Sequence, residues 1–350
     1  MMTGKNKFSS FKYLLILSFI VVVISTIYFH NIYISFFYFA SLTLSFFSLK
    51  YGIQIIQSKN LFQNIRPEGP LNHLKKKNTP TMGGIIIIPI FLLMLSLTNY
   101  IGPELKILLF FTFLGFFIIG LYDDFLSIKN KTNQGLNVKQ KLFLQISLAV
   151  IFTIIAWKNN YINSNIVIPF NHNIDLQESV LPLAILTIVA LSNSVNLTDG
   201  LDGLAAGCSS IVFCGLGIEI LLNNNSNLMI FSLLSFSMSG LCLGFLAFNK
   251  FPAKIFMGDT GSLCIGSIIG VICVLTNSYL ITLIFSGIFL VEALSVIIQV
   301  TYFKLTKLFY KEGKRLLLMS PIHHHFELKG NHESIIVENF WKTNILLVIL

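Results

Sequence analysis

The chain has 350 residues, of which 54% are hydrophobic and only 11% are charged. Soluble domains carry roughly 25% charged residues and disordered chains need low hydrophobicity, so this composition excludes both classes. The net charge of +9 does not indicate nucleic-acid binding, because basic loop residues orient membrane proteins and contact anionic lipid headgroups.

Eleven apolar runs follow one another along the chain, each bounded by polar residues. A bilayer core of about 30 Å requires about 20 helical residues, and unbroken runs argue against a β-barrel, whose strands alternate in polarity. The sequence therefore predicts an all-α fold, a polytopic transmembrane helical bundle of ten or eleven spans in a single domain. The predicted spans are 11–29, 32–56, 82–98, 105–122, 140–157, 180–195, 205–222, 229–248, 261–276, 279–303 and 335–350.

The first and last runs depart from this pattern. Only His30 and Asn31 separate the first two runs, so segment 1–31 either adds a span, forms one bent helix with the next run, or lies at the membrane interface. The last run has about 15 residues where about 20 are needed, and we expect a thinly anchored final span. We expect no removable signal peptide, because no small-residue cleavage site follows the first run.

The connections between the spans alternate between short ones and long ones that contain motifs. The long connections are 57–81, 123–139, 196–204, 249–260 and 304–334, and the basic stretches 57–81, 123–141, 249–260 and 304–334 hold 17 of the 24 Lys and Arg residues. Because Lys and Arg concentrate in cytoplasmic loops, we predict that the motifs face the cytoplasm. On the other side, connection 158–179 is expected to form a small external hairpin.

The five cysteines all lie inside apolar runs, without a Cys-x-x-Cys pair or a histidine at zinc spacing. They are Cys208, Cys214, Cys242, Cys264 and Cys273. Disulfides and structural zinc are therefore not expected, and we interpret these residues as small side chains of the core.

Five of the fifteen acidic residues lie at or near the cytoplasmic ends of apolar runs: Asp123, Asp124, Asp199, Asp202 and Asp259. A single loop carboxylate often only solvates a helix end. Five in glycine-rich contexts indicate a functional site, because charge near the bilayer is costly. Neighbouring helical residues point in different directions, so Asp123 and Asp124 are expected to meet different partners.

Carboxylates without cysteine favour a hard cation. Mg²⁺ binds through one or two carboxylates together with substrate phosphates, which implies a diphosphate substrate. Nearby basic residues, Lys75, Lys76, Lys77, Lys139 and Lys141, could bind the remaining phosphate charge. Alternatively, these lysines only set the orientation of the chain in the membrane, a role that the composition explains equally well.

Three consecutive histidines, His323, His324 and His325, lie in the last long connection. They cannot all point one way on a helix, so they are a poor zinc triad. A weakly metal-binding tract is one alternative, but hydrogen bonding to phosphate or acid–base chemistry is favoured beside a phosphate site. Glu292 and Gln299 lie seven residues apart on one helix face, where they could line the same cleft or join helices.

Taken together, these motifs resemble those of the polyprenyl-phosphate N-acetylhexosamine 1-phosphate transferases, from about Arg66 to Trp341. The most specific segments are 79–84, 196–203, 256–262 and 321–330. The histidine run separates the muramoyl-pentapeptide branch of this family from relatives that use UDP-N-acetylglucosamine.

The resemblance implies a ten-helix enzyme of the bacterial inner membrane, a homodimer in many members, with Mg²⁺ as cofactor. It would move phospho-MurNAc-pentapeptide from UDP-MurNAc-pentapeptide to undecaprenyl phosphate on the cytoplasmic face and release UMP. Two alternatives stay open: a sister transferase that uses UDP-N-acetylglucosamine, and an ion-coupled transporter, a class that also has acidic residues and glycine-interrupted helices.

The resemblance also implies roles for single residues. Asp259 would bind Mg²⁺, Asp123 and Asp124 would act near the polyprenyl phosphate, one of them as base or activator, and Phe256 would stack on uracil. The nucleotide cleft would include Asn196, Asp199, Asp202, Asn249 and Gln299, and the polar site would be completed by Lys76, Thr81, Lys141, Gly258, Ser262, His323, His324 and His325.

Overall fold

A computed structural model describes residues 9–59, 61–62, 76, 79–98, 101–131, 135–168, 172–223 and 225–349. The predicted all-α membrane bundle is confirmed: nine described helices are long and apolar enough to cross a membrane, and α3 is a shorter apolar helix. The helices are α1 (Ser9–Tyr28), α2 (Ile32–Ser58), α3 (Gly84–Leu97), α4 (Pro103–Asn130), α5 (Val138–Lys158), α6 (Val180–Thr198), α7 (Leu204–Leu222), α8 (Met229–Asn249), α9 (Gly258–Thr276), α10 (Tyr279–Phe285), α11 (Gly287–Tyr310), α12 (Ile322–Leu328) and α13 (Glu333–Ile349).

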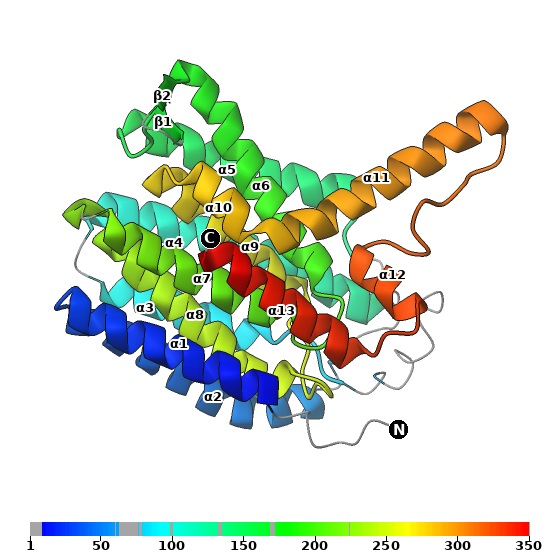
Figure 1. Cartoon of the computed structure of the whole chain (residues 1–350), viewed down its shortest axis with the longest axis horizontal. Coiled ribbons are helices and arrows are strands. Elements are labelled where there is room, and N and C mark those ends of the chain that lie inside the picture. Colours follow the sequence, from blue (N-terminus) through cyan, green and yellow to red (C-terminus); the bar gives the residue numbers. More distant parts are fainter. Residues whose placement is uncertain are drawn as a thin grey trace.

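Helices α7, α8 and α9 form the buried centre of the bundle (Figure 1). Small residues on these helices allow close packing, as is usual between membrane helices. A Cβ atom at Gly240 of α8 would lie 2.4 Å from the Tyr38 carbonyl oxygen of α2, and one at Gly266 of α9 would lie 2.3 Å from the Leu191 carbonyl oxygen of α6. All five cysteines are buried, as expected for small side chains of the core.

The amino-terminal segment forms a helix of its own. Helix α1 ends at Tyr28, His30 has a positive φ of 49°, and the Asn31 side chain caps α2 by accepting a hydrogen bond from the Tyr33 backbone N–H (2.9 Å). The alternative of one bent helix is therefore wrong. The final helix, α13, is held against α7, because Trp341 Nε1 donates to the Gly203 carbonyl oxygen (3.2 Å).

Two predicted boundaries are wrong for a common reason. The predicted span 279–303 is broken at Ser286 into α10 and α11, and α4 continues past the predicted end at 122 to Asn130. Hydropathy marks where lipid contact begins and ends, whereas the helix itself continues or breaks according to its backbone hydrogen bonds. The predicted hairpin is present, with β1 (Asn165–Ile168) antiparallel to β2 (His172–Asp175), and two short 3₁₀ turns cover Gln177–Ser179 and Ser226–Leu228.

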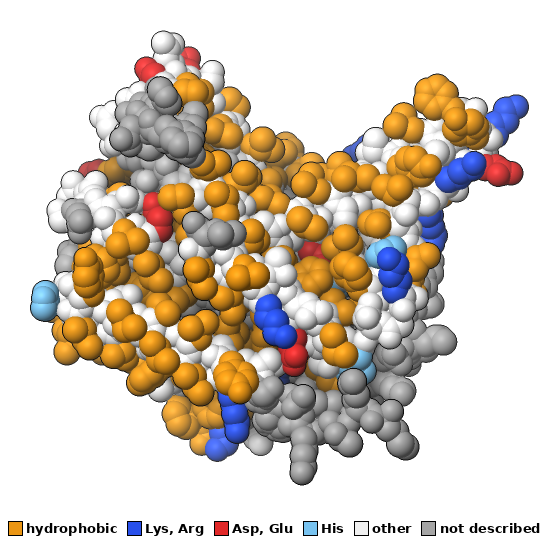
Figure 2. All heavy atoms as spheres, in the orientation of Figure 1, with side chains coloured by type: hydrophobic (Ala, Val, Ile, Leu, Met, Phe, Trp, Pro, Cys, Tyr) orange, Lys and Arg blue, Asp and Glu red, His pale blue; other side chains and the backbone are white. Residues whose placement is uncertain are grey.

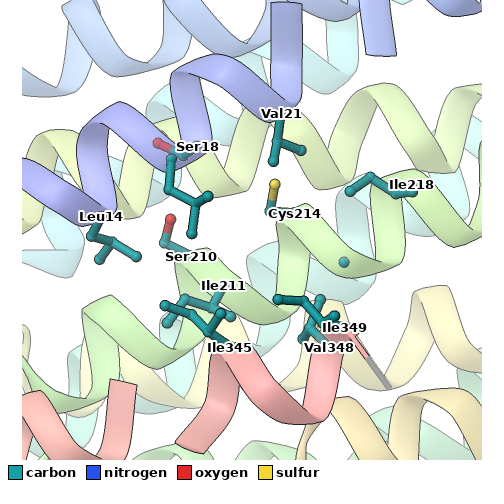
Figure 3. Close-up of a pocket in the computed structure, with 12 residues that line it drawn as sticks. Leu14, Ser18, Val21, Ser210, Ile211, Cys214, Ile218, Ile345, Val348 and Ile349 are labelled. Atoms are coloured by element: carbon teal, nitrogen blue, oxygen red, sulfur yellow. The ribbon is translucent and has the colours of Figure 1, made fainter. Parts of the chain in front are cut away.

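An apolar cavity of about 290 Å³ lies between α1, α7 and α13 (Figure 3). Leu14, Val21, Ile211 and Val348 are among the side chains that line it, and none of its described lining residues was predicted for the functional site. The residues predicted for the functional site therefore lie elsewhere in the bundle.

Three helices converge at the first turn of α9. A Cβ atom at Gly84 of α3 would lie 2.2 Å from the Gly261 backbone nitrogen, and one at Gly120 of α4 would lie 2.2 Å from the Asp259 carbonyl oxygen. Because both contacts are with backbone atoms, they cannot be relieved by a side-chain rotation. Glycine at these positions brings α3 and α4 against the segment that carries Asp259.

We predict that Gly120→Ala destabilises the protein by about 1–3 kcal/mol, because overpacking against a backbone forces the helices apart. Gly115→Ala in the same helix is the matched control, since the three atoms nearest to its Cβ would all belong to the flexible Leu148 side chain. The melting temperatures of the two detergent-purified variants measure the difference. Equal melting temperatures would contradict the close approach of α4 to α9.

Candidate functional site

The candidate site is built around Asp259 in the first turn of α9. The Lys141 ammonium of α5 pairs with Asp259 Oδ2, and Asn196 Nδ2 of α6 donates to Asp259 Oδ1 (2.7 Å) and to Ser262 Oγ (2.9 Å). Ser262 Oγ in turn donates to the Gly258 carbonyl oxygen (2.9 Å). Side chains from two helices, α5 and α6, therefore fix the two oxygens of a carboxylate that α9 carries.

Asp124 of α4 serves as a cap for α9. Its Oδ1 accepts from the Asp259 N–H (3.1 Å), and its Oδ2 accepts from the Thr260 N–H (2.9 Å) and the Thr260 hydroxyl (2.6 Å). A carboxylate is favoured at a helix N-terminus because the first N–H groups lack partners within the helix. Gly258 has a φ of +72°, and a Cβ there would lie 2.5 Å from Asp124 Oδ2, so this contact requires glycine.

Asp199 adds a second acceptor at the same helix start, because its carboxylate accepts a hydrogen bond from the Gly258 N–H. Loss of hydration raises the pKa of Asp199 to about 8, with further contributions from the charges of Asp259 and Asp124. Asp124 and Asp199 are thus both engaged in holding the segment that carries Asp259.

Asp123 points differently from Asp124, as expected for neighbours on a helix. Its Oδ1 accepts from the Leu136 N–H (3.0 Å) and lies 3.9 Å from the Lys141 ammonium. Gly135 lets the chain pass over this carboxylate, since a Cβ there would lie 2.7 Å from Asp123 Oδ2. Lys141 is therefore shared between Asp123 and Asp259.

A second charged cluster joins distant parts of the chain. The Lys76 ammonium lies 2.6 Å from both Asp202 Oδ1 and Glu333 Oε1. Glu333 Oε1 also accepts from the Asp202 N–H (2.7 Å), and Asp202 Oδ2 accepts from the Ala253 N–H (2.8 Å). Burial alone would lower the pKa of Lys76, but the charges of Asp202 and Glu333 outweigh it and raise the pKa. Lys75 and Lys77 lie outside the described residues.

Sequence reasoning missed Glu333. It is a lone acidic residue at the start of α13, more than a hundred positions from its partners, and no motif marks it. The only available signal was its place just after the histidine run, in a chain with few acidic residues.

Backbone contacts bring the predicted motifs together. The Phe256 N–H donates to the Pro80 carbonyl oxygen, and the Gly83 N–H donates to the Phe256 carbonyl oxygen (both 2.8 Å). Asn249 bridges two other motifs, since its Oδ1 accepts from the Gly203 N–H (3.0 Å) and its Nδ2 donates to the Ile255 carbonyl oxygen (2.9 Å). Thr81 is buried, and its N–H donates to the Leu61 carbonyl oxygen (3.0 Å).

The three histidines lie on α12 and point to different partners, as predicted. His323 is fully buried, with its Nδ1 3.0 Å from Glu292 Oε2, and its Nε2 faces Gly200, where a Cβ atom would lie 2.3 Å away. His324 Nδ1 lies 2.7 Å from Glu327 Oε2, and His325 Nδ1 accepts from the Leu318 N–H (3.1 Å).

Of the two interpretations of Glu292 and Gln299, the structure favours joining of chain segments. Glu292 ties α11 to α12 through His323. Gln299 Oε1 accepts from the N–H groups of Leu316 (3.1 Å) and Leu317 (2.8 Å), so this side chain holds the connection after α11. Glu292 Oε1 is buried and has no hydrogen-bond partner among the described residues.

Most of the predicted residues fall into three groups, and Thr81, Phe256 and Gln299 lie outside them. The group at the start of α9 comprises Asp123, Asp124, Lys141, Asn196, Asp199, Gly258, Asp259 and Ser262. Lys76, Asp202 and Asn249 surround the turn before α7, and the histidines lie on α12, with His323 against the same turn. No three His, Cys, Asp or Glu side chains among the described residues already form a metal site.

We predict that Asp199→Asn changes how stability depends on pH. The unfolded carboxyl ionises near pH 3.9, whereas the folded one keeps its proton to about pH 8. Stability is therefore lost as the pH rises through this window, by up to about 1.4 kcal/mol per pH unit. Asparagine cannot ionise, so the melting temperature of the variant should rise relative to the unmodified protein between pH 5 and pH 8.

Asp175→Asn in the hairpin is the control, because hydrogen bonds from Ser164 and the Gln177 N–H lower the pKa of Asp175. That control should show no such trend above pH 5. Parallel pH profiles for Asp199→Asn and the unmodified protein would contradict the raised pKa.

The chain is similar to known proteins along its whole length. The family model for glycosyl transferase family 4 matches residues 106–277, and phospho-N-acetylmuramoyl-pentapeptide-transferase signature 1 matches residues 76–88. The chain is 54% identical to the phospho-N-acetylmuramoyl-pentapeptide-transferase of Prochlorococcus marinus subsp. pastoris (strain CCMP1986 / NIES-2087 / MED4), over 100% of this chain and 98% of that protein. It is 43% identical to the protein of that name from Synechococcus sp. (strain CC9311), over 86% of this chain and 82% of that protein.

These matches confirm the resemblance inferred from the motifs and include the segment around Lys76 and Thr81. The chain belongs to the phospho-N-acetylmuramoyl-pentapeptide-transferase family.

Proposed function

We propose that this protein transfers phospho-MurNAc-pentapeptide from UDP-MurNAc-pentapeptide to undecaprenyl phosphate, forming lipid I and releasing UMP for peptidoglycan synthesis. The observation that carries the proposal is the group at the start of α9, where Lys141 lies between Asp259 and Asp123. A cation between two carboxylates at the end of a membrane bundle suits a diphosphate donor that meets a lipid phosphate. The reaction would take place on the cytoplasmic face of the bacterial inner membrane.

Phosphoryl transfer depends mainly on positioning and on neutralisation of charge. The phosphate monoester of the lipid is already mostly ionised at neutral pH, since its second pKa is about 6, so a strong base is unnecessary. Lys141 would bind diphosphate oxygens in exchange for part of its contact with Asp259. Asp123 would orient the acceptor phosphate, whereas Asp124, which caps α9, would act as a positioning residue.

The donor set at Asp259 fits Mg²⁺. Asp123 and Asp259 lie within hydrogen-bonding distance of each other and share one ammonium group, and Mg²⁺ typically takes one or two carboxylates together with substrate phosphates. Asp259, with Asp123 beside it, would hold the ion. When bound, it would offset the charge of the diphosphate and make UMP a better leaving group.

The other groups would form the walls of the nucleotide site. Phe256 would stack on uracil, on a segment fixed by the backbone contacts with 80–83. Asn249 and the cluster of Lys76, Asp202 and Glu333 would keep the turn before α7 in place. His324 and His325 would face the muramoyl donor, whereas His323, which is fully buried, would position α12.

The proposal is tested by UMP release from detergent-purified protein given undecaprenyl phosphate and UDP-MurNAc-pentapeptide. We expect UMP with Mg²⁺ and none with EDTA. UDP-N-acetylglucosamine as the donor should give no UMP. Release from that rival donor would assign the protein to the sister transferases, and no release from either donor would favour the transporter alternative.

Two variants in α5 test the role of Lys141 in the same UMP-release assay. Lys141→Met should lower kcat by about 100-fold or more, because it removes preorganised charge at the reacting diphosphate. Lys158→Met, at the opposite end of α5, is the matched control and should leave kcat unchanged. Equal activity of both variants would remove Lys141 from the mechanism.

A further inference from the structure

The second half of α11 projects from the bundle. Figure 1 shows this helix running obliquely away from its neighbours, and the chain returns from its end toward α12. We call residues 302–318, which comprise the end of α11 and the returning segment, the basic finger. Leu308, Phe309 and Tyr310 at its end are 75%, 74% and 69% exposed, which is unusual for large apolar side chains unless lipid or a partner covers them.

The basic finger carries five cations and one acidic residue. Figure 2 shows basic side chains beside hydrophobic ones at the end of the projection. The cations are Lys304, Lys307, Lys311, Lys314 and Arg315, the acidic residue is Glu312, and all six are exposed. Among the carboxylates that the structure describes, none forms an ion pair with these five cations. Their charge is therefore available to an external partner.

Charge and apolar surface lie on different sides of the same helix. Lys304 and Lys307 lie three residues apart on one face of α11, and Lys311 is the C-cap residue directly after the helix. Leu305 and Phe309, four residues apart, lie on the adjoining face and continue an exposed apolar stripe from Ile298. This division of faces is typical of helices that lie at the boundary between lipid tails and headgroups.

The returning segment is held in a defined position. The Lys314 N–H donates to Thr306 Oγ1 (2.9 Å), a Cβ at Gly313 would overlap the Phe303 ring, and Gln299 accepts from the N–H groups that follow Arg315. The backbone that carries Lys314 and Arg315 is thus held against α11 before any ligand binds. A preformed cluster loses little conformational entropy on binding.

We propose that the basic finger is a docking surface for anionic phospholipids, with its cations on the headgroup phosphates and Leu305 and Phe309 among the acyl chains. The charge of the basic finger favours an anionic lipid. A zwitterionic lipid has no net charge to pair with the +4 of this short segment, and a soluble partner that bound the cations would leave the apolar face uncovered. Lipid phosphates attract basic clusters next to a membrane span.

The test uses a tryptophan reporter, Phe309→Trp, in bilayers of phosphatidylcholine with a fixed fraction of phosphatidylglycerol. Quenching of the reporter is compared between brominated phosphatidylglycerol and brominated phosphatidylcholine, after subtraction of the signal of the parent chain. We expect a preference of about threefold or more for the anionic lipid at the reporter, falling as salt screens the charges. Leu186→Trp on α6, also exposed, should show no preference.

The finger is neutralised by Lys307→Gln, Lys311→Gln and Lys314→Gln together. In this variant the Phe309→Trp reporter should no longer show a preference for phosphatidylglycerol. Neutralisation of Lys50, Lys59 and Lys158, which lie outside the basic finger, should leave the preference for phosphatidylglycerol unchanged. The proposal would be overturned if brominated phosphatidylglycerol and brominated phosphatidylcholine quench the reporter equally in the unmodified finger. It would also be overturned if the preference for phosphatidylglycerol survives neutralisation of the finger. Displacement of phosphatidylglycerol by an equimolar amount of undecaprenyl phosphate would overturn it as well, since the occupant would then be the polyprenyl lipid.

Discussion

The first turn of α9 is the constraint on which the rest of the site depends. Its leading N–H groups have no partner within the helix, and the carboxylates of Asp124 and Asp199 accept hydrogen bonds from them. The chain reaches this geometry only because Gly258 adopts a positive φ and because Gly84 and Gly120 let α3 and α4 approach closely. Asp259 is therefore presented at a position that several helices determine together.

The five acidic residues predicted for the site divide into groups by what they contact. Asp124 and Asp199 hold α9, whereas Asp123 and Asp259 share Lys141. Asp202, with Glu333, encloses Lys76 and so ties the start of α13 to the turn before α7. This separation explains how a strongly apolar protein can concentrate carboxylates. Each has a defined donor or cation, which offsets the cost of burying charge, and Asp199, whose pKa is raised to about 8, avoids that cost by keeping its proton.

Much of the fold and the site could be predicted from the sequence. The apolar runs locate the helices, and the scarcity of acidic residues identifies Asp123, Asp124 and Asp259 as unusual. The break at Ser286 could not be predicted, because both α10 and α11 are apolar. Asp124 as a cap, Glu333 as a partner of Lys76 and the fully buried position of His323 depend on contacts between distant segments, which local patterns do not encode.

We propose that Asp259 holds the divalent cation and that the surrounding carboxylates support it. Mn²⁺ in place of Mg²⁺ tests this most directly, with bound metal measured by electron paramagnetic resonance in the purified protein. We expect Asp259→Asn to abolish Mn²⁺ binding, whereas Asp202→Asn, altered in the cluster around Lys76, should bind it as the unmodified protein does. Unchanged Mn²⁺ affinity in Asp259→Asn would contradict the account.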